Sequence, residues 1–263
     1  MRRYLCFLFM IFNFCWLSGV RAELTADEIV LKANQAAYYQ GKDGRADVDM
    51  VITDSLGRTR ERSLTILREN ASGGLEQKYY VYFHRPADVK DMAYIVWKHV
   101  KRDDDRWLYL PAMDLVRRIA SSDKRSSFAG TTFLYEDISG RSPEEDRHEL
   151  VKSDGGRFEI KNTPKDPNTI EFSYYNLWID KNNFLPVKAE YYDKQGVLYR
   201  RIEALEIKEI QGFPTVVKMK AEDLNSNSHT VSAFKNVKYD VGLSQEIFNE
   251  RYLRRPPMQW IQG

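Results

Sequence analysis

A two-residue hydrophobic period runs through most of the chain and constrains its fold more than any other feature. Apolar residues alternate with polar ones in successive short segments, as in Val48, Met50 and Ile52. Turns rich in Gly, Asn and Asp separate these segments at short spacing, which is typical of consecutive antiparallel hairpins. The sequence therefore predicts a mainly β fold. We expect a single, strongly curved antiparallel sheet that forms an incomplete β-barrel of about 11 strands, with helices packed into its concave side.

One helix is predicted near the N-terminus. Thr25 and Glu28 have the spacing of a capping box, Ile29 and Ala33 then repeat at helical spacing, and Gly41 ends the segment. The small residues on this face either pack closely against the sheet, which we favour, or lie across an opening. A second, short helix is expected over residues 244–252.

Residues 1–22 have the pattern of a cleaved signal peptide. Arg2 and Arg3 precede the apolar run Leu5–Leu17, and small residues stand before a cut after Ala22. The apolar run is shorter than the roughly 20 residues that span a bilayer. We therefore expect residues 23–263 to form one domain in the periplasm of a Gram-negative bacterium.

Loss of the signal peptide changes both the charge and the cysteine content. It removes three arginines and no acidic residue, so the net charge falls from +2 to −1 and gives no argument for nucleic-acid binding. It also removes Cys6 and Cys15, the two cysteines of the chain. The mature protein must then be stabilised by its core, without disulfides.

The sequence has no recognisable catalytic motif. Its four histidines are scattered, and it has neither a His-Glu-x-x-His nor a Gly-x-Ser-x-Gly motif. The acidic turn Asp103–Asp105 is more typical of a solvated loop than of a calcium site. Glu136–Asp137 and Glu144–Asp146 are the local acid candidates for a hydrolase acting on envelope lipids, which is a less favoured alternative. We expect no enzyme activity, no metal and no cofactor.

Aromatic residues are abundant although no catalytic groups accompany them. Phe172, Tyr174 and Trp178 share one parity of an expected strand, and Trp107 and Tyr109 share another. Most such residues must form a core, but a curved sheet has more concave apolar surface than one or two helices fill. The remaining surface would form a pocket for lipophilic ligands.

Residues 121–142 form the longest stretch without clear alternation. Loops of this length inside a compact domain are usually functional lids or disordered segments. Phe128, Phe133, Leu134 and Tyr135 argue against disorder. We therefore expect a lid.

Residues 106–138 carry a resemblance to a known family. Their motifs are Trp107-x-Tyr109-x-Pro111, Arg117-Arg118-Ile119 and the aromatic stretch Phe128–Asp137. With these motifs the chain resembles the LolA-like superfamily of outer-membrane lipoprotein-sorting proteins, which includes LolA, LolB and RseB. It is most similar to the longer branch found beside RND/MMPL-type exporters. Many relatives have Gly-Ser-Asp where this chain has Gly130-Thr131-Thr132.

The resemblance implies an incomplete barrel whose apolar cavity receives acyl chains without a cofactor. The implied function is a monomeric periplasmic carrier of a lipid or lipoprotein, working toward the outer membrane with an inner-membrane RND/MMPL transporter. The alternative is an RseB-like sensor or accessory protein that binds a membrane protein partner without transport. Arg117 and Arg118 would contact a lipid headgroup or a partner, or would simply form a solvated strand edge. The implied cavity-wall residues are Trp97, Trp107, Tyr109, Phe172, Tyr174 and Trp178, and the implied lid residues are Phe128, Phe133 and Tyr135.

Overall fold

Thirteen antiparallel strands form one sheet in the order β6-β5-β4-β3-β2-β1-β13-β12-β11-β10-β9-β8-β7. The computed structural model describes residues 23–71 and 76–262, so the signal peptide predicted over residues 1–22 lies outside the described residues. The strands are β1 (Asp43–Thr53), β2 (Thr59–Asn70), β3 (Gln77–Arg85), β4 (Ala93–Lys98), β5 (Asp105–Leu110), β6 (Leu115–Ile119), β7 (Asp146–Asp154), β8 (Arg157–Pro164), β9 (Phe172–Asp180), β10 (Pro186–Asp193), β11 (Leu198–Ile210), β12 (Phe213–Asp223) and β13 (Ser228–Tyr239).

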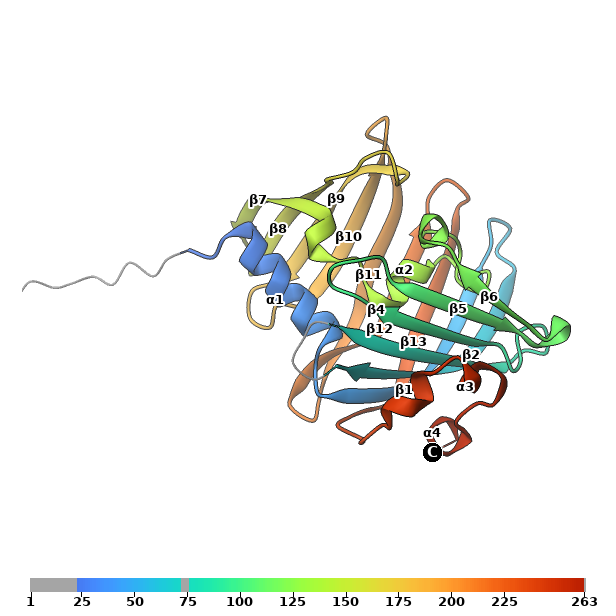
Figure 1. The fold of residues 1–263 in the computed structure, drawn as a ribbon. Helices are drawn as coiled ribbons and strands as arrows, with labels where there is room; N and C mark the ends of the chain where they lie inside the picture. Colours follow the sequence, from blue (N-terminus) through green and yellow to red (C-terminus); the bar gives the residue numbers. More distant parts are fainter. Residues whose placement is uncertain (1–22, 72–75, 263) are drawn as a thin grey trace, which may run out of the picture.

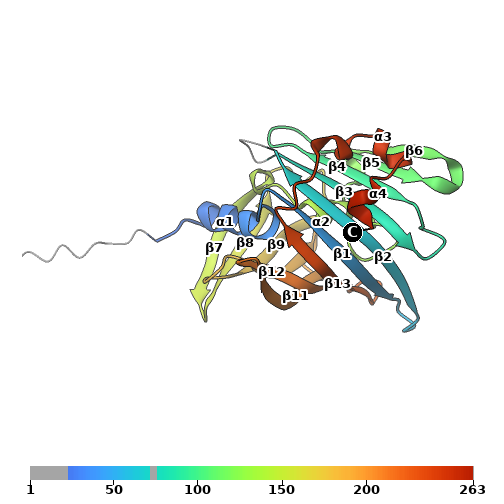
Figure 2. The same cartoon turned by 90° about the horizontal axis from the view of Figure 1, so that it is seen from below.

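The sheet bends strongly, but its two outer strands, β6 and β7, do not pair with each other (Figures 1 and 2). The predicted incomplete β-barrel is therefore confirmed. The sheet has 13 strands rather than about 11, because every alternating segment of the chain pairs as a separate strand.

The helices are short except for the first one. Within the described ranges, no helix combines the length and the apolar character needed to cross a bilayer. The helices are α1 (Ala26–Tyr38), α2 (Tyr135–Ser139), α3 (Arg251–Arg254) and α4 (Met258–Ile261), and the 3₁₀ turns are η1 (Pro111–Met113), η2 (Ser121–Asp123), η3 (Pro143–Glu145) and η4 (Gln245–Phe248).

Helix α1 begins at the predicted capping box. The Glu28 amide donates to Thr25 Oγ1 at 3.2 Å, and the Thr25 amide donates to Glu28 Oε2 at 2.8 Å. Ile29 and Ala33 are buried against Ile160 of β8 and Ile179 of β9. The helix therefore packs on one end of the sheet, as we favoured.

The 121–142 segment enters the concave side of the sheet (Figure 1). The Phe128 amide donates to the Phe133 carbonyl at 2.8 Å, and this tight turn directs the Phe128 ring into the core. That ring is fully buried between Phe83 of β3 and Tyr94 of β4. The segment thus fills the part of the concave side that faces β1–β6.

The C-terminal helices lie on the opposite, convex face (Figure 2). Leu243, Phe248 and Leu253 pack there against Tyr80 and Ile95, whose side chains point away from the concave core. Our expectation that helices occupy the concave side is therefore confirmed for α1 and α2 and wrong for α3 and α4. The physical reason is that the outward side chains of β3 to β5 are also apolar and need a cover.

Candidate functional site

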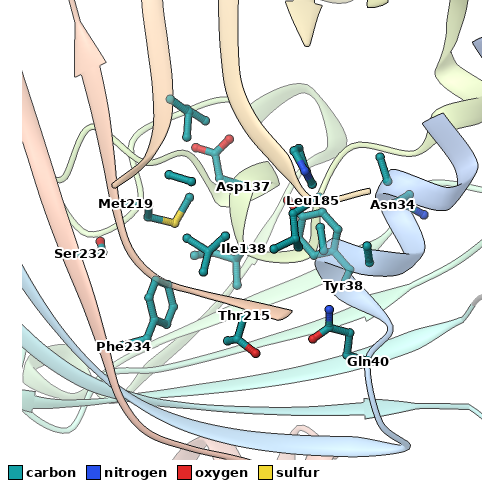
Figure 3. Close-up of a pocket in the computed structure, with 18 of the residues that line it drawn as sticks. Asn34, Tyr38, Gln40, Asp137, Ile138, Leu185, Thr215, Met219, Ser232 and Phe234 are labelled. Carbon is teal, nitrogen blue, oxygen red and sulfur yellow. The ribbon is translucent and has the colours of Figure 1, made fainter. Parts of the chain in front are cut away.

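A cavity of about 380 Å³ remains in the concave side, lined by α1, α2, strands β9–β13 and parts of β1–β3 (Figure 3). Its volume falls at the lower end of the range of about 300–1,000 Å³ that small-molecule pockets occupy. Most of its walls are apolar. The apolar lining includes Val30, Ala33 and Ala37 of α1, Ile138 of α2, Leu177 and Leu185, Ile202 and Ala204 of β11, Met219 of β12 and Phe234 of β13.

The cavity exists because the inward side chains of its floor are small or flexible. On β13, Ser232 lies between Met50 of β1 and Met219 of β12, its two cross-strand neighbours. Ala204 of β11 lies opposite Met219. These side chains do not reach α1 across the curve of the sheet, and the 121–142 segment fills only the neighbouring half.

A network of buried charges attaches the 121–142 segment beside the cavity. Glu136 of α2 is only 2% exposed, and its carboxylate lies 2.5 Å from Arg125, 3.2 Å from Arg141 and 3.3 Å from Lys124. Burial by itself raises the pKa of the Glu136 carboxyl, but the three cations outweigh burial and lower this pKa to about 2. Glu136 is therefore ionised at neutral pH and holds the segment in place.

The neighbouring acid, Asp137, is also paired with a cation. Its Oδ2 atom accepts from Arg200 of β11 at 2.5 Å and from the Leu134 amide at 2.7 Å. The Arg200 guanidinium lies over the ring of Tyr191 of β10, 5.1 Å from the ring centre. Asp137 and Tyr191 both line the cavity, so this pairing brings polar groups to an otherwise apolar wall.

The C-terminal end of α1 is tied down at the same wall. The Tyr38 carbonyl accepts from Arg68 of β2 at 2.6 Å and from Gln77 of β3 at 2.7 Å. The Tyr38 ring lies directly against Gly140, the residue after α2. Helix α1 and the 121–142 segment therefore meet at one point and close the cavity together.

Three of the predicted wall residues lie away from the cavity. Trp97, Trp107 and Tyr109 point to the convex face, where they pack with the C-terminal segment. Trp97 donates through Nε1 to the Phe248 carbonyl at 2.7 Å, and its ring packs edge-on against Trp107. Their placement as cavity wall was wrong, because alternation shows that residues share a face but does not show which face is concave.

The three predicted wall residues on β9 are divided by a β-bulge. Tyr174 pairs with Tyr192 and Phe172 with Asp193, so Ser173 is an extra residue between them. The bulge turns Phe172 into the concave core, whereas Tyr174 and Trp178 point outward. None of these three residues lines the cavity, since on β9 that role falls to Tyr175 and Leu177.

The predicted lid residues are part of the concave core. Phe128 and Tyr135 are buried in it, and Phe133 is buried and also lines the cavity. The exposed pair on β6 has local partners: Arg118 pairs with Asp105, and Arg117 lies 3.7 Å from Asp123. The turn Asp103–Asp105 is less solvated than expected, because Asp105 is buried beneath His99 and Arg102.

The acidic residues considered for hydrolysis lie near one another, but basic side chains lie between their carboxylates. Arg141 lies between Glu136 and Asp146, donating to Asp146 through two nitrogens at 2.9 Å each. Among residues 23–71 and 76–262, no three His, Cys, Asp or Glu side chains gather in a way that could hold a metal ion. The local chemistry of these acids is ion pairing.

Sequence reasoning missed most of the residues that form the cavity. Tyr38, Tyr191, Met219, Ser232 and Phe234 come from four separate elements, and no short motif joins them. Two sequence signals did lead to it: Phe133, predicted as a lid residue, lines the cavity, and so do Ala33 and Ala37 of the small-residue face of α1.

Comparisons with known proteins agree with this architecture. A protein-family model described as an uncharacterized protein matches residues 75–255. A DUF1329 family protein from Desulfovibrio piger shares 30% sequence identity, with a TM-score of 0.79 over 87% of this chain and 97% of that chain. A domain from Vibrio parahaemolyticus named for outer membrane lipoprotein sorting shares 26% identity, with a TM-score of 0.80 over 88% of this chain and 98% of that chain.

A LolA superfamily protein from Nitrosomonas europaea has the same fold at 20% identity, with a TM-score of 0.68 over 88% of this chain and 100% of that chain. The search of curated proteins gave no match. The family match, the identity to the Desulfovibrio protein and the shared open sheet lead to one assignment: the chain belongs to the DUF1329 family of LolA-like proteins.

Proposed function

We propose that this protein is a periplasmic carrier that holds the acyl chains of a lipid or lipoprotein in the concave cavity and passes them toward the outer membrane. The observation that carries the proposal is the cavity of about 380 Å³ with mostly apolar walls beneath α1 and α2. The lipoprotein-sorting name of the Vibrio relative supports the same role.

Apolar burial supplies the binding energy in this proposal. Each methylene group withdrawn from water contributes about 0.8 kcal/mol, so a medium-length chain gains several kcal/mol without a charged contact. Release then requires a partner with a greater affinity for the cargo. We propose an inner-membrane RND/MMPL-type exporter as the protein with which the carrier works.

The same site argues against a hydrolytic role. A general acid needs a pKa near the working pH, whereas the pKa of Glu136 is lowered to about 2 by the surrounding cations. Asp146 is held by Arg141 and also accepts from the Tyr175 hydroxyl at 3.0 Å. We therefore propose binding without catalysis, and neither a metal nor a cofactor.

A second candidate function is an RseB-like sensor or accessory protein that binds a membrane protein partner. The edge strand β6 favours it, because the side chains of Arg117 and Arg118 are 58% and 68% exposed there. In this candidate function, β6 contacts the partner and the cavity has no role in binding it. An Arg117→Ser/Arg118→Ser variant would lose the partner but keep lipid binding.

A pair of variants on one strand tests the carrier proposal. Ala204→Phe adds a ring inside the cavity, whereas Leu205→Phe adds a similar ring on the exposed side of the same strand. Native mass spectrometry and lipid extraction of protein purified from the periplasm would show co-purified lipid in the wild type and in Leu205→Phe. We expect the amount of bound lipid to fall at least tenfold in Ala204→Phe, which corresponds to a loss of about 1.4 kcal/mol or more in binding free energy. Equal lipid content in both variants, or none in the wild type, would contradict the proposal.

A further inference from the structure

One wall of the cavity carries polar groups without protein partners. Among the described residues, no hydrogen bond is formed by the hydroxyl groups of Tyr38 and Tyr191 or by the Oδ1 atom of Asp137. All three residues line the cavity, and Figure 3 shows Tyr38 and Asp137 on its wall. Since unpartnered polar groups in an apolar site weaken folding, their presence calls for a ligand that uses them.

The three groups lie close together. The hydroxyl-bearing end of the Tyr38 ring rests on Gly140, and Gly140 follows Asp137 by three residues, which places both on one side of α2. Arg200 joins the other two, because it pairs with Asp137 and covers the Tyr191 ring. We call Tyr38, Tyr191 and Asp137 the polar clasp.

The chemistry of the clasp selects one kind of ligand group. Burial first, and the charge of Asp137 second, raise the pKa of the Tyr38 hydroxyl, so this group stays protonated and donates. Burial also raises the pKa of Tyr191, which donates as well. Asp137 accepts, and Arg200 balances its charge. A matching group both donates and accepts hydrogen bonds and is neutral, because a carboxylate anion offers only acceptors and would leave the Asp137 Oδ1 atom without a donor.

We infer that the cavity binds amphiphiles with the polar end inside, and that Tyr38, Tyr191 and Asp137 hold a neutral hydrogen-bonding group, of which an alcohol hydroxyl is the simplest. This inference rests on the proposed function, because it names the chemistry of a ligand for the same cavity. It differs from simple acyl-chain binding, in which a methyl end would leave the clasp unsatisfied.

A hydrocarbon probe and an alcohol separate the two ideas. The fluorescent hydrocarbon 1,6-diphenylhexatriene reports whether the cavity accepts apolar molecules, and its displacement by dodecan-1-ol reports alcohol binding. In a Tyr38→Phe/Tyr191→Phe variant, we expect dodecan-1-ol to bind about five- to tenfold more weakly, while the hydrocarbon binds as in the wild type. The single variants should each show a smaller loss of about two- to fivefold, and they keep the test open if the double variant is unstable.

Tyr239→Phe is the matched control. Tyr239 also lines the cavity, but its hydroxyl is already bonded to Thr215 Oγ1 at 2.8 Å. We expect its affinity for dodecan-1-ol to stay within about twofold of the wild type. Dodecanoate should bind more weakly than dodecan-1-ol, and Asp137→Asn should reduce that difference by removing the negative charge.

The outcomes distinguish the inference from the proposed function. If neither the hydrocarbon nor the alcohol binds the wild type, the proposed function fails and the clasp fails with it. If both bind but the Tyr→Phe variants leave the alcohol affinity unchanged, the clasp is wrong and the apolar carrier stands. Selective loss of alcohol binding in those variants, but not in Tyr239→Phe, supports the clasp.

Discussion

The ring of Tyr38 packs so closely on Gly140 that a β-carbon at position 140 would lie 2.6 Å from two of its atoms. This contact joins the end of α1 to the residue after α2, and both helices close the cavity. Gly140 also has a φ of +75°, which side chains rarely adopt. Position 140 therefore requires glycine for its backbone and for its neighbour.

Gly140→Ala should destabilise the protein and displace Tyr38. We expect a loss of about 2–4 kcal/mol in unfolding free energy, measured by urea denaturation, from the left-handed backbone and the clash together. Gly57→Ala is the control, because Gly57 has a φ of +77° but nothing lies within 4 Å of an added β-carbon. It should lose only about 1 kcal/mol. Equal losses of unfolding free energy in the two variants would show that the contact between Tyr38 and position 140 does not contribute to stability.

Glu136→Gln should be strongly destabilising, because it leaves Arg125, Arg141 and Lys124 buried without their shared carboxylate. We expect a loss of about 3–5 kcal/mol in unfolding free energy. Glu171 also pairs with Arg125, at 2.7 Å, but its side chain is 46% exposed. Glu171→Gln should therefore cost less than about 1 kcal/mol. A small effect at both positions would mean that the buried network does not hold the 121–142 segment.

Lys98 should make stability rise with pH on the alkaline side. Its Nζ is buried against the carbonyls of Ser139 and Gly140, and burial lowers its pKa from 10.5 to about 8. Between these two values the unfolded chain carries the proton and the folded chain does not, so raising the pH favours folding. The unfolding free energy of the wild type minus that of Lys98→Met should increase from pH 8 to pH 10, by up to about 3 kcal/mol. If this difference in unfolding free energy does not change between pH 8 and pH 10, Lys98 has the same pKa in the folded and unfolded chains.

Trp107→Ala should lower stability without changing ligand binding. The Trp107 ring is buried on the convex face beneath the C-terminal segment, so its removal leaves a void of aromatic size there. We expect a loss of about 3–5 kcal/mol, with an unchanged affinity for 1,6-diphenylhexatriene at temperatures where the variant is folded. Trp178→Ala is the control, because Trp178 also points outward but is only half-buried. Its ring contacts Lys188. Weaker probe binding in folded Trp107→Ala would contradict the assignment of this ring to the convex face.

Much of the architecture could be predicted from local patterns. Alternation and turn residues predicted the antiparallel order and the open barrel, and the spacing of Thr25 and Glu28 predicted the start of α1. These features depend on neighbours within a few residues, which a sequence displays directly. The aromatic stretch around Phe128 was predicted to be a lid rather than a disordered loop, and its rings fill the concave core.

The residues that form the cavity could not be predicted in the same way. The sequence by itself determined which residues alternate, where strands turn and that the chain belongs with LolA-like proteins. Only the tertiary structure decided which face of β3–β5 is concave, how an extra Ser173 reverses Phe172 relative to Tyr174, and that Tyr38, Tyr191 and Asp137 meet. The physical reason is that a side chain's face depends on register and curvature set by distant strands, and those long-range pairings leave no local mark in the sequence.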